Sequence, residues 1–327
     1  MNIILKDKID TTTEKPLIDI YKRHIHKLRV QLTDACNFRC FYCMPTNVKF
    51  KKHSELLTPN EIFNICHTLV KYFGVNELRL TGGEPTIRGE FDEIVTSLAK
   101  LNLKKFGLTT NGFILKNKLN ILKENNCNYI NVSLDSLQED NFNKITKSSY
   151  FKPVFESILL AKEKDFKIKI NVVAMKGVND HELLDFINFS AKYDIEVRFL
   201  ELMKIGEANS NNNSLFISAK EIIDELKKHE TLIPIKVPKD STSFNFKTSS
   251  GAKIGFIASE TMPFCTACSR LRLNATGKLR ACLMSESGIE MKDKTIDQYE
   301  DILQSLIAMK PYYRIDHIEQ PMYQIGG

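Results

Sequence analysis

The stretch Thr33–Pro45, "TDACNFRCFYCMP", places Cys36, Cys40 and Cys43 within eight residues and has no fourth cysteine nearby. One face of a buried helix could carry thiols at positions i, i+4 and i+7. Chance explains the pattern poorly, because eight cysteines in 327 residues give this match about 6 times in 10,000. Structural zinc sites and 4Fe-4S clusters normally take four protein ligands. Three thiolates therefore predict a metal site with an open position, where a substrate or cofactor can bind.

Strand-like and helix-like segments alternate on both sides of this triplet from about residue 28 to residue 200. Strand-helix alternation repeated six times predicts parallel strands joined by right-handed crossovers. Six units are two short of a closed eight-stranded barrel, so the predicted fold class is α/β, an open, partial (β/α)6 TIM-like barrel. Its site is expected at the carboxyl ends of the strands. The predicted strands are 28–32, 77–81, 105–110, 129–134, 167–174 and 196–202, and the predicted helices are 58–74, 91–101, 117–126, 153–165 and 180–193.

The last third of the chain has a different character. After the last predicted strand, the stretch up to Ser214 is rich in Asn, Ser and Gly and predicts a loop, and a helix is expected over 218–229. A polar region, expected to contain a hairpin, follows, and the tail "YQIGG" is too glycine-rich to be a packed helix end. We divide the chain into an N-terminal extension (1–27), the barrel core (28–215) and a C-terminal region (216–327).

Composition and charge narrow the class of protein. Hydrophobic residues make up 43% of the chain, enough for a core, and 46 Lys and Arg against 40 Asp and Glu give a net charge of +6. This mild excess suits an anionic ligand but lacks the basic clusters of a nucleic-acid-binding protein. The N-terminal apolar run is too short for a signal peptide, and no run predicts a membrane span. We therefore expect a cytoplasmic protein.

Cytoplasmic thiols are normally reduced, so the eight cysteines are not expected to form disulfides. Cys66 lies in a predicted amphipathic helix and Cys127 at a helix-to-strand junction, and both are interpreted as buried structural residues. The other six fall into two groups of three: Cys36, Cys40 and Cys43, and Cys265, Cys268 and Cys282.

Three further motifs follow successive predicted strands. "LTGGEPTIR" (80–88) contains two glycines that let the backbone approach a ligand closely, and "LTTNG" (108–112) and "NVSLD" (131–135) end the next two strands. Each alone reads equally well as an ordinary turn. Together with the triplet they favour one ligand site at this edge of the sheet.

Cations recur within the predicted strands at Arg29, Arg79, Lys169 and Arg198. A cation that faces inward is costly to desolvate unless an anion meets it. Salt bridges across the barrel are one explanation, and a basic cavity for phosphate groups is the other.

The second triplet lies in "PFCTACSRLRLNATGKLRACL" (263–283), as a CxxC followed by one more cysteine 14 residues later. A zinc site with a histidine as the fourth ligand remains an alternative here. Arg270 and Arg272 lie between the cysteines and are expected to point the same way on an extended segment.

The sequence "CNFRCFYC" resembles the CxxxCxxC motif of the radical S-adenosylmethionine (radical SAM) enzymes. With the other motifs, the likeness from Leu28 to Cys282 and at the terminal Gly326-Gly327 is to the GTP 3′,8-cyclase family, which begins molybdenum cofactor biosynthesis. This resemblance implies two 4Fe-4S clusters, one on each triplet, with the first triplet catalytic and S-adenosylmethionine on its open iron. It further implies contacts with S-adenosylmethionine from Tyr42, Gly83, Ser133 and Met203, contacts with GTP from Arg29, Arg79, Thr109, Lys169, Arg270 and Arg272, and a Gly326-Gly327 tail in the active site.

The reaction implied by the resemblance is a lyase reaction. A radical generated from S-adenosylmethionine removes hydrogen from C3′ of GTP, and the ribose radical attacks C8, giving 3′,8-cyclo-7,8-dihydro-GTP. The implied partners are GTP, a reductant that the sequence does not identify and the next enzyme of the pathway, with a homodimer left open. The alternatives are a peptide- or protein-modifying radical SAM enzyme and, from another class, a zinc-bearing scaffold or electron carrier.

Overall fold

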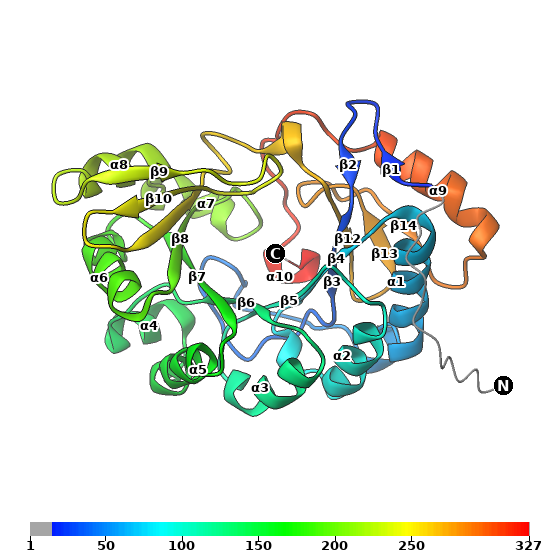
Figure 1. Ribbon diagram of the computed structural model, residues 1–327, viewed down its shortest axis with the longest axis horizontal. Coiled ribbons are helices and arrows are strands. Elements are labelled where there is room, and N and C mark those ends of the chain that lie inside the picture. Colours follow the sequence, from blue (N-terminus) through cyan, green and yellow to red (C-terminus); the bar gives the residue numbers. More distant parts are fainter. Residues whose placement is uncertain (1–14, 327) are drawn as a thin grey trace.

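The computed structural model describes residues 15–326, apart from the side chains of residues 210–212. Twelve strands of this part form one sheet in the order β14-β13-β12-β3-β4-β5-β6-β7-β8-β11-β10-β9, and β1 and β2 form a separate pair. The sheet curves around a central opening, with helices on its outer side and the C-terminal helix α10 in the opening (Figure 1).

Six consecutive parallel strands form the wall of the barrel. They are β3 (Lys27–Gln31), β4 (Glu77–Thr81), β5 (Lys105–Thr110), β6 (Tyr129–Ser133), β7 (Lys167–Ala174) and β8 (Glu196–Glu201). The two terminal strands of the sheet, β14 and β9, do not pair with each other, so the barrel stays open. The prediction of an open, partial barrel is confirmed.

The crossover helices cover the outer face of this wall. They are α1 (Pro59–Phe73), α2 (Phe91–Ala99), α3 (Leu115–Glu124), α4 (Glu139–Thr146), α5 (Phe151–Glu163) and α6 (Leu183–Tyr193). Local signals define α1 well, because Thr58 and Glu61 form a capping box and Gly74 ends the helix in a left-handed conformation. Helix α4 was not predicted, since only Phe142 and Ile145 are apolar in it.

Strands from the C-terminal region extend both edges of the barrel. Strand β12 (Arg270–Leu273) pairs in parallel with β3, and β11 (Lys253–Ile257) pairs in parallel with β8. Eight parallel strands thus surround the opening. The remaining strands, β9 (Leu232–Ile235), β10 (Phe244–Thr248), β13 (Lys278–Arg280) and β14 (Ile289–Glu290), are antiparallel to their neighbours and include the expected hairpin.

Two predictions for this region were wrong. The segment expected to be a loop contains α7 (Ala208–Leu215), where Ala208 packs with Leu202 and Met175, so tertiary contacts override the weak helix propensity of Asn and Ser. The glycine-rich tail contains α10 (Met322–Ile325), and Gly326 ends that helix with φ of 67°. The glycine therefore caps a packed helix rather than preventing it.

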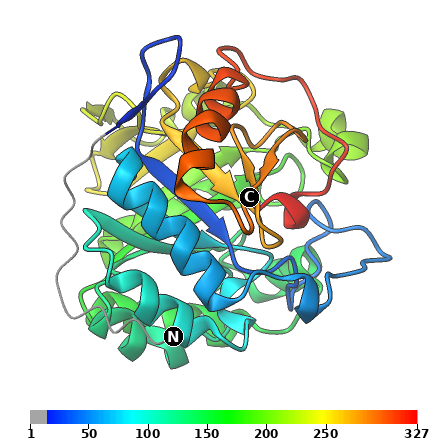
Figure 2. The same cartoon turned by 90° about the vertical axis from the view of Figure 1, so that its right-hand side faces the viewer.

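The remaining helices are α8 (Ala219–Leu226) and α9 (Ile296–Ala308), with short 3-10 turns at η1 (His53–Glu55), η2 (Pro85–Ile87), η3 (Asp180–Glu182) and η4 (Cys265–Ala267). The N-terminal hairpin of β1 (Leu17–Ile18) and β2 (His24–Ile25) packs against α9 (Figure 2). Cys66 and Cys127 are fully buried in the core, as predicted. No helix within residues 15–326 is long and apolar enough to cross a membrane.

Candidate active site

A cavity of about 1170 Å³ runs through the opening of the barrel. All six cysteines of the two triplets line it, and so does every residue predicted to contact S-adenosylmethionine or GTP. Of the terminal glycine pair, Gly326 lies beside the cavity-lining Arg272, and Gly327 is outside the described residues. One space therefore brings together motifs that are up to about 250 residues apart in the chain.

The first triplet occupies the loop that follows β3, and the GGEP segment after β4 supports this loop. The backbone N–H of Gly83 donates to the carbonyl of Thr33 at 2.8 Å, and that of Glu84 donates to the carbonyl of Ala35 at 2.8 Å. A Cβ atom on Gly83 would lie 2.3 Å from the Ala35 oxygen. The glycine is thus required by the close approach of two backbones immediately before Cys36.

Replacing Gly83 by alanine should therefore push the Cys36 loop away from the β4 turn. We expect iron incorporation at the first triplet to fall by about tenfold or more, as for other supports of metal ligands. Iron content after anaerobic reconstitution measures this effect. Gly89→Ala is the matched control, because a Cβ there meets no atom within 4 Å, and an unchanged iron content in Gly83→Ala would contradict the assigned role.

The three thiols of the first triplet form no disulfide, and the carboxylates of Glu84 and Asp135 act on them with negative charge. Burial raises the pKa of Cys36 to about 11 and that of Cys43 to about 12, and burial also raises the pKa of Cys40 well above its usual value. The negative charges of Asp135 and of the neighbouring thiolates add to the shifts of Cys40 and Cys43. Thiolates form here only when a cation compensates them, which fits a metal cluster.

The spacing of the thiols also bears on the kind of metal. Within residues 15–326, no three His, Cys, Asp or Glu side chains converge closely enough to hold one metal ion. In an iron-sulfur cluster each thiolate binds a different iron, so the sulfur atoms stay well apart. The three thiols line one cavity, where each could bind a different iron of such a cluster.

A buried carboxylate holds the aromatic residue of the first motif. The Tyr42 hydroxyl donates to Oδ2 of Asp135 at 2.6 Å, and Oδ1 of Asp135 accepts from the backbone N–H of Val173 at 2.8 Å. Burial raises the pKa of Asp135 to about 6. This role of Asp135 was not predicted, although the residue ends the "NVSLD" motif.

Three arginines form a row across neighbouring strands of the barrel. In the sheet register, Arg272 of β12 lies beside Arg29 of β3, and Arg29 lies beside Arg79 of β4. Burial and mutual repulsion lower the pKa of Arg29 well below its usual value, and burial lowers the pKa values of Arg79 and Arg272 to about 10. Among the described residues no carboxylate forms an ion pair with any of the three. The arginine row, Arg272, Arg29 and Arg79, is therefore suited to a polyanionic ligand.

The other two predicted strand cations have a different environment. Glu196 accepts from Nζ of Lys169 at 2.7 Å and from Nε of Arg198 at 2.6 Å. Both cations therefore have a local acidic partner, on the adjacent strand for Lys169 and on the same strand for Arg198, and both also line the cavity. Glu196 was not singled out in the sequence, where it is simply the first residue of a predicted strand.

The second triplet comes from two places in the chain. Cys265 and Cys268 lie at η4, just before β12, and Cys282 lies just after β13. Burial opposes ionisation of Cys268, but the charges of Arg270 and Lys310 outweigh it and lower the pKa of this thiol to about 6. Nζ of Lys310 donates to the backbone carbonyls of Arg270 and Ala281, both at 2.7 Å. Lys310 lies just after α9 and belongs to no recognisable motif, so the sequence did not indicate that it lies beside the second triplet. Unlike the first, the second triplet has cationic surroundings.

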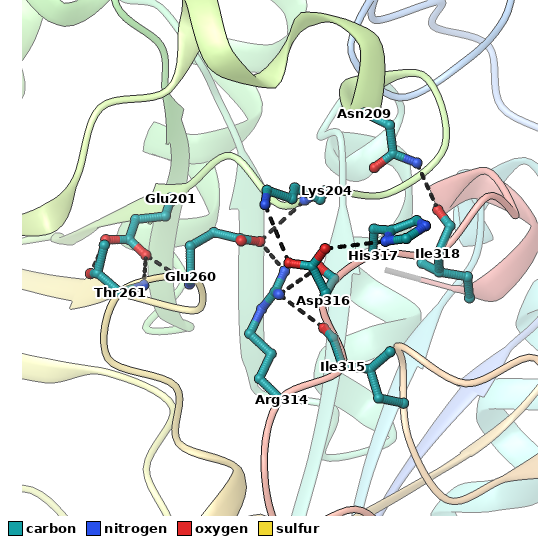
Figure 3. A network of polar contacts seen from close by, with 10 residues as sticks. All are labelled: Glu201, Lys204, Asn209, Glu260, Thr261, Arg314, Ile315, Asp316, His317 and Ile318. Atoms are coloured by element: carbon teal, nitrogen blue, oxygen red, sulfur yellow. Dashed lines mark hydrogen bonds and ion pairs between the residues drawn. The ribbon is translucent and has the colours of Figure 1, made fainter.

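Polar contacts tie the C-terminal tail to the segments that follow β8 and β11 (Figure 3). Arg314 forms an ion pair with Glu260, and Lys204 forms another with Asp316 at 3.3 Å. Further along the tail, Gln31 donates to the carbonyl of Tyr323 at 2.7 Å.

The end of the tail contacts the arginine row directly. Nη1 of Arg272 donates to the carbonyl of Gly326 at 2.7 Å. A Cβ atom on Gly326 would lie 3.0 Å from Cβ of Gln31, and its φ of 67° also favours glycine. The tail is therefore tied to the predicted GTP-binding residues.

Two family models together match most of the chain. Residues 30–190 match the Radical SAM superfamily, and residues 195–315 match Molybdenum Cofactor Synthesis C. Among solved structures, SuiB from Streptococcus suis bound to its precursor peptide SuiA is similar, with a TM-score of 0.65, 14% identity and coverage of 88% of this chain and 68% of that chain. At this identity the likeness concerns the fold alone.

Proteins named GTP 3′,8-cyclase are similar over nearly the whole chain. The protein from Synechocystis sp. is 44% identical over 313 residues, which are 96% of this chain and 95% of that protein. The protein from Clostridium botulinum strain Okra is 40% identical over 324 residues, which are 95% of this chain and 100% of that protein. The chain therefore belongs to the GTP 3′,8-cyclase family of the radical SAM superfamily.

Proposed function

We propose that this protein is a lyase that converts GTP to (8S)-3′,8-cyclo-7,8-dihydroguanosine 5′-triphosphate, the first step of molybdenum cofactor biosynthesis. The observation that carries the proposal is the convergence of both cysteine triplets and the arginine row on one cavity. A radical enzyme needs such an enclosed space, because water and other groups would quench its intermediate.

Membership of the radical SAM superfamily implies S-adenosylmethionine and a 4Fe-4S cluster as cofactors. Cys36, Cys40 and Cys43 would hold this cluster, since their thiols line one wall of the cavity and require a compensating cation. When bound, the reduced cluster supplies the electron that cleaves S-adenosylmethionine to a 5′-deoxyadenosyl radical. Tyr42, held by Asp135, would orient the cofactor from the same loop.

Gly83, Ser133 and Met203 complete the proposed S-adenosylmethionine site. Gly83 keeps the Cys36 loop in place, Ser133 ends β6, and Met203 follows β8. All three face the cavity on the carboxyl side of the strands, where barrel enzymes place their chemistry.

The arginine row would bind the triphosphate of GTP. Its three guanidinium groups repel each other in the absence of an anion, so a triphosphate relieves unfavourable charge as it binds. Arg270, Thr109 and Lys169 line the same cavity and would add contacts to the nucleotide. Holding both ends of GTP would keep C3′ facing the radical, and positioning of this kind is the main contribution of the protein chain.

Cys265, Cys268 and Cys282 would hold a second 4Fe-4S cluster with one iron open to the substrate. With three thiolates, such a cluster carries net negative charge, and Lys310 and Arg270 act on Cys268 with positive charge. The cationic surroundings thus fit an anionic site built on three thiolates, such as this cluster.

One experiment tests the reaction. The reconstituted protein is incubated anaerobically with S-adenosylmethionine, dithionite and either GTP, ATP or no nucleotide. We expect 5′-deoxyadenosine to form in a GTP-dependent manner and about eight iron and eight sulfide per chain. Formation of 5′-deoxyadenosine that requires a peptide instead would favour a peptide-modifying enzyme, and zinc alone would refute the radical reaction.

We expect the protein to act in the cytoplasm, to receive electrons from a cellular reductant and to pass its product to the next enzyme of the pathway. We further propose that the chain divides at residues 27 and 215 and that the protein can act as a homodimer.

A further inference from the structure

Lys310 is a buried cation without an acidic partner. Only 3% of the residue is exposed, and its ammonium donates to the carbonyls of Arg270 and Ala281. No carboxylate in residues 15–326 forms an ion pair with it. Its attractive electrostatic interactions are with Cys268 and Cys282. Burial of an ammonium group is costly unless an anion compensates its charge. Negative charge on the Cys268 and Cys282 thiolates would therefore explain why Lys310 is buried here.

The two carbonyls that Lys310 contacts lie next to cluster cysteines in the chain. Arg270 is two residues after Cys268, and Ala281 immediately precedes Cys282. One ammonium therefore links the two backbone segments that carry these thiols. These bonds lie at the open end of the β12–β13 hairpin, beyond the paired residues 272–273 and 279–280, so they hold the two segments together there.

Arg23 holds the backbone of the remaining cysteine, Cys265, and the backbone of Lys310. Nη1 of Arg23 donates to the carbonyls of Cys265 at 2.7 Å and Pro311 at 2.9 Å, and Nη2 donates to the carbonyl of Lys310 at 3.0 Å. Asp19 holds the guanidinium at 2.5 Å, and both residues of this pair are buried. The N-terminal hairpin thus reaches the second triplet.

We propose that Lys310 and Arg23 are positioning residues for the second cluster: together they hold the backbone of Cys265, Cys268 and Cys282 in the binding geometry, and the Lys310 charge offsets that of the cluster. The inference rests on the proposed second cluster. Arg23 acts on position alone, because Asp19 neutralises it. Lys310 acts on position and charge, and its charge favours the more negative, reduced form of the cluster.

The test uses full-length protein in which Cys36, Cys40 and Cys43 are all replaced by alanine, so that every bound iron belongs to the second cluster. Lys310→Met, Lys310→Arg and Arg23→Met are added separately, and Lys294→Met, at an exposed lysine, is the control. Iron content, the rate of iron release to a chelator and the reduction potential are measured, with circular dichroism to confirm folding.

We expect Lys310→Met to release iron about tenfold faster and to have a more negative potential than the parent. Lys310→Arg should restore most of the potential, and Arg23→Met should release iron faster than the Lys294→Met control. If Lys310→Met does not fold, Lys310→Gln replaces it, with the same shift in potential expected.

The outcomes separate the two proposals. A parent protein that binds about four irons, with iron release and potential unchanged in both Lys310→Met and Arg23→Met, would overturn the inference and leave the second cluster intact. A parent that binds no iron would refute the second cluster, and the inference with it.

Discussion

Replacing Cys36 by alanine is expected to abolish cleavage of S-adenosylmethionine and to lower the iron content from about eight to about four per chain. Loss of a residue that only supports a metal ligand costs about 10- to 100-fold in metal affinity, and loss of the ligand itself costs more. The remaining thiols, Cys40 and Cys43, are buried among groups that raise their pKa values, so they cannot form stable thiolates without the cluster. The rate of 5′-deoxyadenosine formation should therefore fall to background.

Cys66→Ala provides the matched control for this prediction. Cys66 is a fully buried thiol of α1 that lies outside the cavity. Its replacement should cost stability through the small cavity it leaves and should retain all eight irons. Cleavage of S-adenosylmethionine by Cys36→Ala protein would show that the first triplet does not hold the catalytic cluster.

Replacing Arg29 by methionine is expected to weaken GTP binding by about 10- to 100-fold, the equivalent of one charge-assisted contact with a phosphate. Arg29 is the central member of the arginine row and, among the described residues, has no ion pair or hydrogen bond of its side chain to lose. The same replacement should raise the thermal unfolding temperature. Burial and the neighbouring arginines lower the pKa of Arg29, so its charged form destabilises the folded protein, and a neutral side chain removes that cost.

Isothermal titration calorimetry with GTP and a thermal unfolding scan without GTP measure the two effects. Lys152→Met, at an exposed position on α5, changes the net charge equally and should leave both values nearly unchanged. Opposite changes in affinity and stability are typical of a binding site that is strained without its ligand. An Arg29→Met protein that binds GTP as tightly as the parent would remove Arg29 from the site.

Much of the site could be predicted from the sequence because its motifs are local. The spacing of Cys36, Cys40 and Cys43, the glycine pair at 82–83 and the alternation of strands and helices are all contained in short windows. Parallel strands place their carboxyl ends at one edge of a sheet, so the order of the motifs was enough to bring them to one cavity. Thr58 and Pro59, likewise, marked the start of α1 by local chemistry.

Other features depend on contacts between distant parts of the chain, and no local pattern contains these contacts. Pairing of β12 with β3 joins residues about 240 positions apart and creates the row of Arg272, Arg29 and Arg79. The helical state of 208–215 and 322–325 depends on packing that outweighs the composition. Asn and Ser within the first segment, and the two glycines that follow the second, gave the opposite indication.

The sequence by itself determined the chemistry that the protein carries: two incomplete sets of thiolates, an open barrel and a group of strand cations. Only the tertiary structure decided how those groups are held. A lone lysine such as Lys310, or an Asp19–Arg23 pair, is chemically unremarkable in a sequence, and it acquires a role only when folding buries its charge beside the second triplet. The physical reason is that ligand type and spacing are local properties, whereas desolvation and charge compensation depend on every element packed around a group.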